Sequence, residues 1–257
     1  MGSALGLQGR TAEAISYYRR ALEIDPNYSD AHYNVATLLQ REGSLDNAIS
    51  HYRKALEVAP NYIEVRNNLG NALRSKGQTE EAIACYRKAL EFDPDYSEAY
   101  NNLGVALASQ GRIDEAIHQY RRAVGIDPDF ADAHYNLAMT LGAREHNYEA
   151  IAHHRRVVEL KPDLVEAHYN LATLLHQEGD LDEAILHYRK ALELKSDFAR
   201  AHNNLGSALG SQGHTKEAAF HYRKALEIRP DFDEARGNLD LVIGLQKHLP
   251  ASLPSTR

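Results

Sequence analysis

The sequence is poor in cysteine and lacks tryptophan altogether: Cys85 is the one cysteine among 257 residues. A lone cysteine excludes an intramolecular disulfide and a thiolate metal cage, and it fits a reducing compartment. Apolar runs extend over only a few residues, which is too short for a transmembrane helix. The amino-terminal segment also lacks the basic and apolar stretches of a secretory signal. Together these absences predict a cytoplasmic protein.

Basic charge is also scarce. The chain has 29 Lys and Arg against 36 Asp and Glu, a formal net charge of -7. Nucleic-acid binders usually carry a basic surplus, so the charge argues against that class. The sequence contains no glycine-rich phosphate loop, no nucleophile elbow, and no helix with two histidines at metal-binding spacing. These observations predict neither an enzyme nor a cofactor or metal site.

What is present is a repeat of 34 residues, marked by a proline that recurs at that interval. Ser196 takes the proline's place once. We number each repeat from 1 to 34 with this proline at position 32. The marker prolines are Pro26, Pro60, Pro94, Pro128, Pro162 and Pro230.

This numbering defines the predicted organisation. Residues 1–28 form a front-truncated repeat, residues 233–248 a C-terminal capping helix, and residues 249–257 a flexible tail. The full repeats are residues 29–62, 63–96, 97–130, 131–164, 165–198 and 199–232.

Each repeat carries two apolar stripes at helical spacing, the first through positions 7 and 11 and the second through positions 20, 24, 27 and 28. Position 20 is Ala in every copy, and position 8 is Gly or Ala in every full repeat. A glycine at position 15, such as Gly43, stops the first helix, and the proline at position 32 ends the second. The pattern predicts a helix–turn–helix hairpin that is stable only in a stack.

At these positions the sequence resembles the tetratricopeptide-repeat family. The family pattern of an aromatic at 4, Leu at 7, Gly or Ala at 8, Ala at 20, an aromatic at 24, Ala at 27 and Pro at 32 is matched from residue 1 to about 247. The resemblance implies an all-α fold, a right-handed α-solenoid superhelix. It also implies that the first helices line a concave groove.

Position 6 is Asn in every copy that includes it, and its place opposite the apolar stripe puts it on the groove face. An Asn side chain both donates and accepts, so a row of them suits an extended peptide backbone. The row is similar to the asparagine ladder of O-linked N-acetylglucosamine transferase. Hydrogen bonding between adjacent hairpins is the structural alternative. The ladder consists of Asn34, Asn68, Asn102, Asn136, Asn170, Asn204 and Asn238.

Two further rows flank the ladder. Acids at position 2 complement helix dipoles and would also make the groove negative, which favours basic or neutral partner segments over acidic tails. A Tyr side chain at position 5 offers a partner a large apolar ring that ends in a polar hydroxyl. These rows comprise Asp30, Glu64, Glu98, Asp132, Glu166, Tyr33, Tyr135 and Tyr169. Basic pairs at positions 25 and 26 predict a solvated opposite face with salt bridges, or less readily an anion-binding surface.

Histidine is abundant, with 14 copies, many at positions 4 and 23. Packing and interface polarity explain these positions most simply, with a metal site or a pH switch as the alternative.

The repeat 131–164 departs furthest from the pattern. Gly142 falls within its first helix, Glu145 replaces the turn glycine and His154 replaces the core Tyr. Asn147 is expected to supply the left-handed residue that Glu145 supplies poorly. These features, with Gly125 just before them, predict a soft joint between residues 125 and 157; sequence drift in one repeat is the alternative.

The leading functional interpretation is a scaffold that holds an extended segment of a partner protein in its groove. A structural protein that self-associates end to end is a second possibility, because the front repeat is cut short and the cap is apolar. A third is the non-catalytic targeting region of a larger enzyme, such as a glycosyltransferase.

Overall fold

The computed structural model describes residues 10–248, and the side chains of residues 10–244. Residues 1–9 of the front-truncated repeat and the tail expected at residues 249–257 therefore lie outside the described residues.

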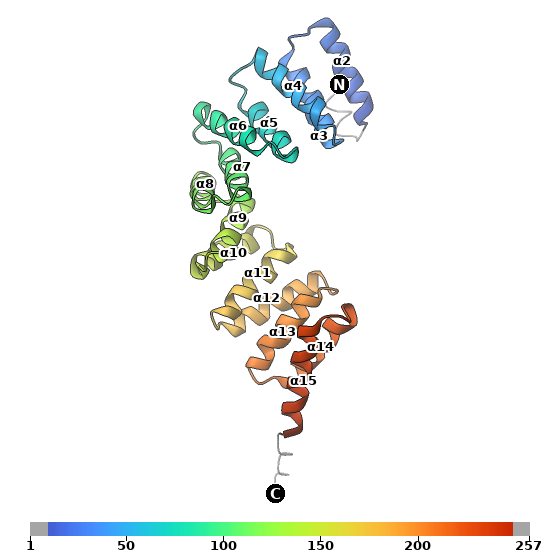
Figure 1. The fold of residues 1–257 in the computed structure, drawn as a ribbon, viewed down its shortest axis with the longest axis vertical. Helices are drawn as coiled ribbons and strands as arrows, with labels where there is room; N and C mark the ends of the chain where they lie inside the picture. The colour runs from blue at the N-terminus through green and yellow to red at the C-terminus, as the bar shows by residue number, and fades with distance from the viewer. Residues whose placement is uncertain (1–9, 249–257) are drawn as a thin grey trace. The chain divides into compact units, whose positions relative to one another are not determined.

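All regular structure within residues 10–248 is helical (Figure 1). The helices of the amino-terminal half are α2 (Thr11–Ile24), α3 (Ser29–Arg41), α4 (Leu45–Val58), α5 (Ile63–Ser75), α6 (Thr79–Phe92), α7 (Ser97–Ser109) and α8 (Ile113–Ile126). Those that follow are α9 (Ala131–Gly142), α10 (Asn147–Leu160), α11 (Val165–Gln177), α12 (Leu181–Leu194), α13 (Ala199–Ser211), α14 (Thr215–Ile228) and α15 (Asp233–His248).

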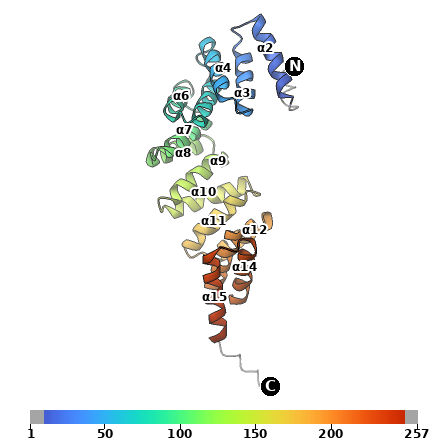
Figure 2. The same ribbon diagram turned by 45° about the vertical axis from the view of Figure 1, so that its right-hand side comes forward.

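Among helices α2 to α8, and again among α10 to α15, consecutive helices pack on one another as stacked hairpins. Helix α3 packs on α4, α5 on α6 and α7 on α8, and α4 packs in turn on α5. The same order holds for α11 to α15. Figure 2 shows α2, α3 and α4 side by side in the amino-terminal unit. The all-α solenoid of stacked hairpins predicted from the repeat is confirmed.

The chain divides into two compact units, residues 1–136 and residues 137–257. The boundary lies inside α9, within the segment 125–157 where the sequence predicts a soft joint. Each unit is a stack of hairpins in its own right.

The turn inside each hairpin shows why glycine stands at position 15. Gly43 has φ 78°, a left-handed conformation in which a side chain is unfavourable. Its N–H donates to the carbonyl of Gln40 at 3.0 Å, and that of Ser44 donates to the carbonyl of Leu39 at 2.9 Å. This paired arrangement closes the end of the first helix and reverses the chain.

The divergent repeat makes the same turn with a different residue. Glu145 itself adopts the left-handed conformation, with φ 62°, and His146 donates to the carbonyl of Leu141 at 3.0 Å. The expectation that Asn147 would take this role was wrong, because Asn147 begins α10. Gly142 lies in α9 as predicted, and it is the last residue of that helix. The stack imposes the turn although a non-glycine residue there costs about 1–2 kcal/mol.

Small residues and tyrosine rings form the core between the helices of a hairpin. Ala48 at position 20 is fully buried, as are its counterparts in the other repeats. A Cβ added to Gly70 at position 8 would lie 2.5 Å from the ring of Tyr86, so this ring needs a small neighbour.

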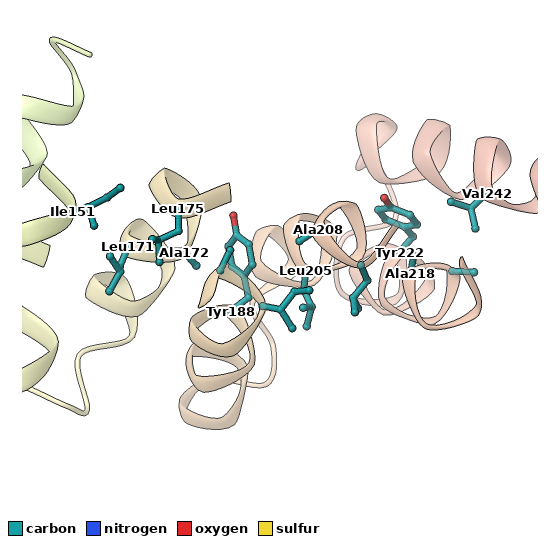
Figure 3. Packing of buried hydrophobic residues seen from close by; sticks show 14 residues of the cluster. Ile151, Leu171, Ala172, Leu175, Tyr188, Leu205, Ala208, Ala218, Tyr222 and Val242 are labelled. Atoms are coloured by element: carbon teal, nitrogen blue, oxygen red, sulfur yellow. The ribbon is translucent and has the colours of Figure 1, made fainter. Parts of the chain in front are cut away.

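In the second unit the buried side chains continue from one hairpin to the next (Figure 3). Leu171, Tyr188, Leu205, Tyr222 and Val242 belong to one cluster, contributed by α11 to α15. Val242 of α15 belongs to this cluster, so α15 packs on the preceding hairpin.

Candidate functional site

The asparagine ladder lies on the first helices, and its members are partly exposed in every hairpin. The helical period places position 6 on the side opposite the buried leucines, such as Leu69 and Leu73. The partly exposed residues are Asn34, Asn68, Asn102, Asn136, Asn170, Asn204 and Asn238.

The ladder side chains also join neighbouring hairpins. Nδ2 of Asn102 donates to Oδ1 of Asn67 at 3.0 Å, and Nδ2 of Asn68 donates to the hydroxyl of Tyr33 at 3.2 Å. The acceptor is in each case the position-5 residue of the preceding hairpin, 35 residues back. Asn136, Asn204 and Asn238 make the equivalent bonds, to Asn101, Tyr169 and Asn203.

These bonds are the ones that the structural alternative for the ladder predicted. They do not exhaust its binding capacity, because a primary amide has two N–H donors and an oxygen acceptor. Two members make other bonds: Asn34 donates to the carbonyl of Asp30 at 2.6 Å, and Asn170 donates to the sulfur of Met139 at 3.1 Å. Met139 belongs to the divergent repeat.

The acidic row at position 2 lies in the first turns of the first helices, and all its members are exposed. These residues are Asp30, Glu64, Glu98, Asp132, Glu166 and Glu234. Some of them bind position 5: Glu64 accepts from the Tyr33 hydroxyl, and Glu234 accepts from Nδ2 of Asn203 at 2.9 Å. Burial, reinforced by Glu64, raises the pKa of Tyr33. The acids and position 5 are thus parts of one polar face.

The three tyrosines at position 5 are half-buried and not fully displayed. Tyr33 packs beside Tyr62, with ring centroids 5.6 Å apart, and Tyr169 packs beside Phe198 at 4.8 Å. Tyr135 on α9 is also half-buried. The rings of Tyr33 and Tyr169 thus contact aromatic residues at the start of the next hairpin.

The histidines form couples that the sequence interpretation missed. Nδ1 of His32 at position 4 lies 2.9 Å from Nδ1 of His51 at position 23. His168 pairs in the same way with His187, and His202 with His221, each at 3.0 Å.

In the couple of His32 and His51, the accepting imidazole is neutral. Nε2 of His32 lies 3.0 Å from the carbonyl of Pro26, which can only accept, so Nε2 carries the proton and Nδ1 accepts from His51. Burial, and then the neighbouring His32, lowers the pKa of His51 to about 4. Burial, and then His202, likewise lowers the pKa of His221 to about 4.

A signal for these couples was present in the repeat. Every repeat with His at position 23 also has His at position 4, whereas Arg66 is matched with Cys85 and Tyr100 with Gln119. Burial raises the pKa of the Cys85 thiol, which does not favour a nucleophile. Across the described part of the chain, three potential metal ligands do not gather anywhere.

The opposite face is built from ion pairs of the second helices, as predicted. Arg155 bonds Glu183 of the next hairpin at 2.6 Å, and Arg189 bonds Glu217 at 2.6 Å. Within one helix, Lys224 bonds Glu227 at 2.7 Å. Exposed pairs of this kind contribute about 0–1 kcal/mol each. The expectation of a solvated face with salt bridges is confirmed.

The repeats of the chain match models of a known protein family. A model described as a TPR repeat matches residues 2–43, 39–73, 70–111, 106–143 and 173–213, and a tetratricopeptide-repeat model matches residues 199–232. The chain belongs to the tetratricopeptide-repeat family. The matched ranges pass from 106–143 to 173–213, so residues 144–172, which include the second helix of the divergent repeat, lie between them.

Solved tetratricopeptide-repeat structures resemble the chain closely. YrrB, described as a TPR protein with an unusual peptide-binding site, is 28% identical with a TM-score of 0.68, over 72% of this chain and 96% of YrrB. MamA is 30% identical with a TM-score of 0.59, over 63% of this chain and 95% of MamA. A TPR repeat-containing protein from Cytophaga hutchinsonii, 19% identical with a TM-score of 0.73 over 93% of this chain and 98% of that one, shows the shared fold.

The search of curated proteins gave no match. Proteins of the tetratricopeptide-repeat family are typically non-catalytic interaction scaffolds, and in these general terms the chain is a protein-interaction scaffold. None of the helices that the structure describes has the length and apolar character needed to cross a bilayer.

Proposed function

We propose that the face formed by the first helices binds an extended segment of a partner protein, and that the ladder asparagines hold its backbone. The observation that carries this proposal is the recurrence of a partly exposed Asn at the same place in every hairpin. An extended segment repeats a donor and an acceptor along its length, which a row of amides can match. YrrB, a similar protein, has a peptide-binding site according to its description.

The charge of this face determines which segments it favours. The position-2 acids are exposed and flank the ladder, and they are interrupted only at Arg200. A negative face attracts basic segments and repels acidic ones. The favoured partner is therefore a protein with an extended basic or neutral segment.

The decisive experiment separates binding from the structural role of the ladder. Asn68, Asn102, Asn136 and Asn170 are changed together to Ala, and binding to pooled unstructured 12-residue peptides is measured. The expected result is weaker binding, by about 0.5–1.5 kcal/mol for each lost hydrogen bond, with little change in melting.

Position 5 provides the matched control. Changing Asn67 and Asn101 to Ala removes acceptors of the same inter-hairpin bonds but leaves the ladder in place. Binding per folded molecule should be lost in the ladder variant and kept in the control. Equal loss in both variants, or unfolding of the ladder variant with binding preserved per folded molecule, would show that the ladder is structural.

The charge preference is tested with peptide pools that differ only in net charge. Basic peptides should bind best, and their affinity should fall with added salt, because exposed charges are screened over about 8 Å at physiological ionic strength. A preference for acidic peptides that salt does not change contradicts the proposal.

One observation favours a second function, self-association through the carboxyl-terminal helix. Leu241 on α15 is 64% exposed, while its neighbour Val242 packs into the core. Light scattering against concentration should then show a mass above 28.8 kDa that Leu241→Lys returns to the monomer value. A concentration-independent monomer leaves peptide binding as the function.

A further inference from the structure

The ladder face of the second unit contains a pocket, which the residue pattern of the other repeats does not predict. It has a volume of about 300 Å³ and lies among α9, α10 and α11. Met139 and Gly142 of α9 line it, together with His154 of α10, and Asn170, Thr173 and Leu174 of α11. Asn170 is a member of the ladder, so the pocket borders the proposed path of the bound segment.

The pocket can be traced to two substitutions in the divergent repeat. In an ordinary hairpin the position-24 Tyr reaches the first helix: the Tyr52 hydroxyl donates to Oε1 of Gln40, at position 12, at 2.8 Å. The Tyr86 hydroxyl donates to Oδ1 of Asn71, at position 9, at 2.8 Å. The divergent repeat has the shorter His154 at position 24 and Gly142 at position 12.

The repeat 199–232 shows that the glycine alone does not open the space. It also has glycine at position 12, but a Cβ added to Gly210 would lie 3.9 Å from the hydroxyl of Tyr222. In both repeats the added Cβ would lie 3.9 Å from the position-20 alanine, Ala218 or Ala150, but at Gly142 its other neighbour is Leu174, at 3.6 Å. The tyrosine hydroxyl that approaches the glycine in one repeat is missing from the other.

The pocket suits an uncharged, mainly apolar group. The described residues that line it include no Asp, Glu, Lys or Arg. Burial lowers the pKa of His154 to about 4, so the imidazole is neutral near pH 7. A charged side chain placed here would be desolvated without a counter-ion. The thioether of Met139, whose residue is 44% exposed, offers favourable contact to an aromatic ring.

We propose that this pocket receives one large apolar side chain of the partner segment, preferably an aromatic one. The inference rests on the proposed function of the groove and adds a requirement that a backbone-reading ladder cannot impose. A ladder of identical asparagines permits a segment to bind in several registers. A single side-chain pocket next to Asn170 fixes one register and selects sequences with an aromatic residue there.

The pocket can be tested without any peptide. Met139 lines the pocket, so a sample labelled with 13C at the methionine methyl group gives a reporter there. Titration with p-cresol, the side-chain analogue of Tyr, should shift the Met139 signal saturably. An unmoved Met139 signal overturns the inference.

Two variants fill the pocket from within. His154→Tyr restores the ring of the ordinary repeats, and the combination of Ala172 with Tyr188 in the next repeat shows that this ring fits over an alanine such as Ala138. Gly142→Gln restores the position-12 residue of the repeat 29–62. Both variants should abolish the p-cresol shift while the matched control Gly210→Ala keeps it. A shift that persists in folded His154→Tyr and Gly142→Gln overturns the inference.

Peptides then connect the pocket to the groove. A neutral 12-residue peptide with one Phe, moved stepwise along its length, is compared with versions carrying Ala or Lys there. One placement of Phe should bind about tenfold more tightly than Ala, which corresponds to about 1.4 kcal/mol. His154→Tyr should remove this preference.

The outcomes separate the two proposals. Peptides that bind through the ladder with no preference for Phe overturn the pocket inference and leave the groove function standing. If p-cresol shifts Met139 but no peptide binds, the groove function fails, and the inference fails with it, since the pocket would then accept only free aromatic molecules.

Discussion

The divergent repeat 131–164 and the repeat 199–232 fold into the same hairpin from different residues. Both have glycine at position 12 and a small residue at position 8. At position 24, however, one has His154 and the other Tyr222, and at the turn one has Glu145 and the other Gly213. Glu145 takes φ 62° where Gly213 takes φ 83°. A hairpin in a stack can thus keep its backbone conformation when the tyrosine at position 24 and the turn glycine are replaced.

The two repeats differ in how they use the space between their helices. The ring of Tyr222 lies over Gly206, where an added Cβ would be 2.8 Å away, and the tyrosine is 4% exposed. His154 is 1% exposed, yet a pocket opens beside it. In the repeat 199–232 the ring of Tyr222 fills the space between the helices and stabilises the hairpin. In the divergent repeat the shorter His154 stabilises the hairpin less and leaves a pocket on the ladder face.

Lowering the pH should have the largest effect on the free energy of unfolding, and it acts on both repeats. The pKa values of His154 and His221 are about 4 in the folded chain, below the ordinary value of 6.5. The unfolded state therefore takes up protons first, so stability is complete above pH 6.5 and is lost as the pH falls toward 4. Each buried His contributes at most about 1.4 kcal/mol per pH unit, and the half-exposed couples contribute less.

Urea unfolding between pH 7 and pH 4.5 measures this loss. His154→Tyr removes one titrating group, so its stability should fall less steeply with decreasing pH than that of the unchanged chain. Stability that is constant over this range would show that the imidazoles accept protons without cost.

Exchanging the position-24 residues between the two repeats should have the next largest effect. Tyr222→His removes a buried ring from the repeat 199–232 and should lower the free energy of unfolding by about 3 kcal/mol. His154→Tyr fills space beside the helices and should raise the free energy of unfolding by about 1 kcal/mol. Tyr222→Phe is the control, because it keeps the ring. Hydrogen exchange resolved by helix assigns each change to its hairpin, and equal exchange in α13 and α14 before and after Tyr222→His would contradict the prediction.

Exchanging the turn residues should have a smaller effect. Glu145→Gly should stabilise the hairpin by about 1 kcal/mol, because glycine adopts the left-handed conformation without a steric penalty. Gly213→Glu should destabilise its hairpin by a similar amount. Thermal melting of both variants checks the pair, and the absence of a gain from Glu145→Gly would mean that the Glu145 side chain contributes compensating contacts.

The smallest effects should come from the helical glycines. A Cβ added to Gly125 in α8 meets no atom within 4 Å, so Gly125→Ala should stabilise α8 by a few tenths to about 1 kcal/mol. Gly142→Ala should gain less, because Gly142 is the last residue of α9. The denaturant concentrations at the midpoints of unfolding compare the stability of the two variants, and a larger stabilisation by Gly142→Ala would contradict this order.

The sequence predicted the hairpins well, because their determinants lie within one repeat. The turn glycine, the small residue at position 8 and the buried alanine at position 20 each act on residues of the same hairpin. Glu145 was misjudged because a local steric penalty of about 1–2 kcal/mol was weighed without the packing of neighbouring hairpins, which outweighs it.

The candidate site was less accessible to sequence reasoning. The ladder positions could be found from the repeat, but their bonds to position 5 join residues 35 apart and depend on how hairpins stack. The His couples could have been found by reading positions 4 and 23 together. The pocket could not have been found from the sequence, because it depends on how the side chains of neighbouring helices fill the space beside Gly142.

The regular spacing of the contacts has a consequence for how the chain is made. The recurring side-chain bonds join residues 19, 28 and 35 positions apart, as in His32 with His51, Arg155 with Glu183, and Asn102 with Asn67. A ribosome therefore needs to release only about one further repeat before the preceding hairpin can make its bonds. The chain can fold from its first hairpin onward during synthesis, and the time it spends with exposed apolar surface does not grow with the number of repeats.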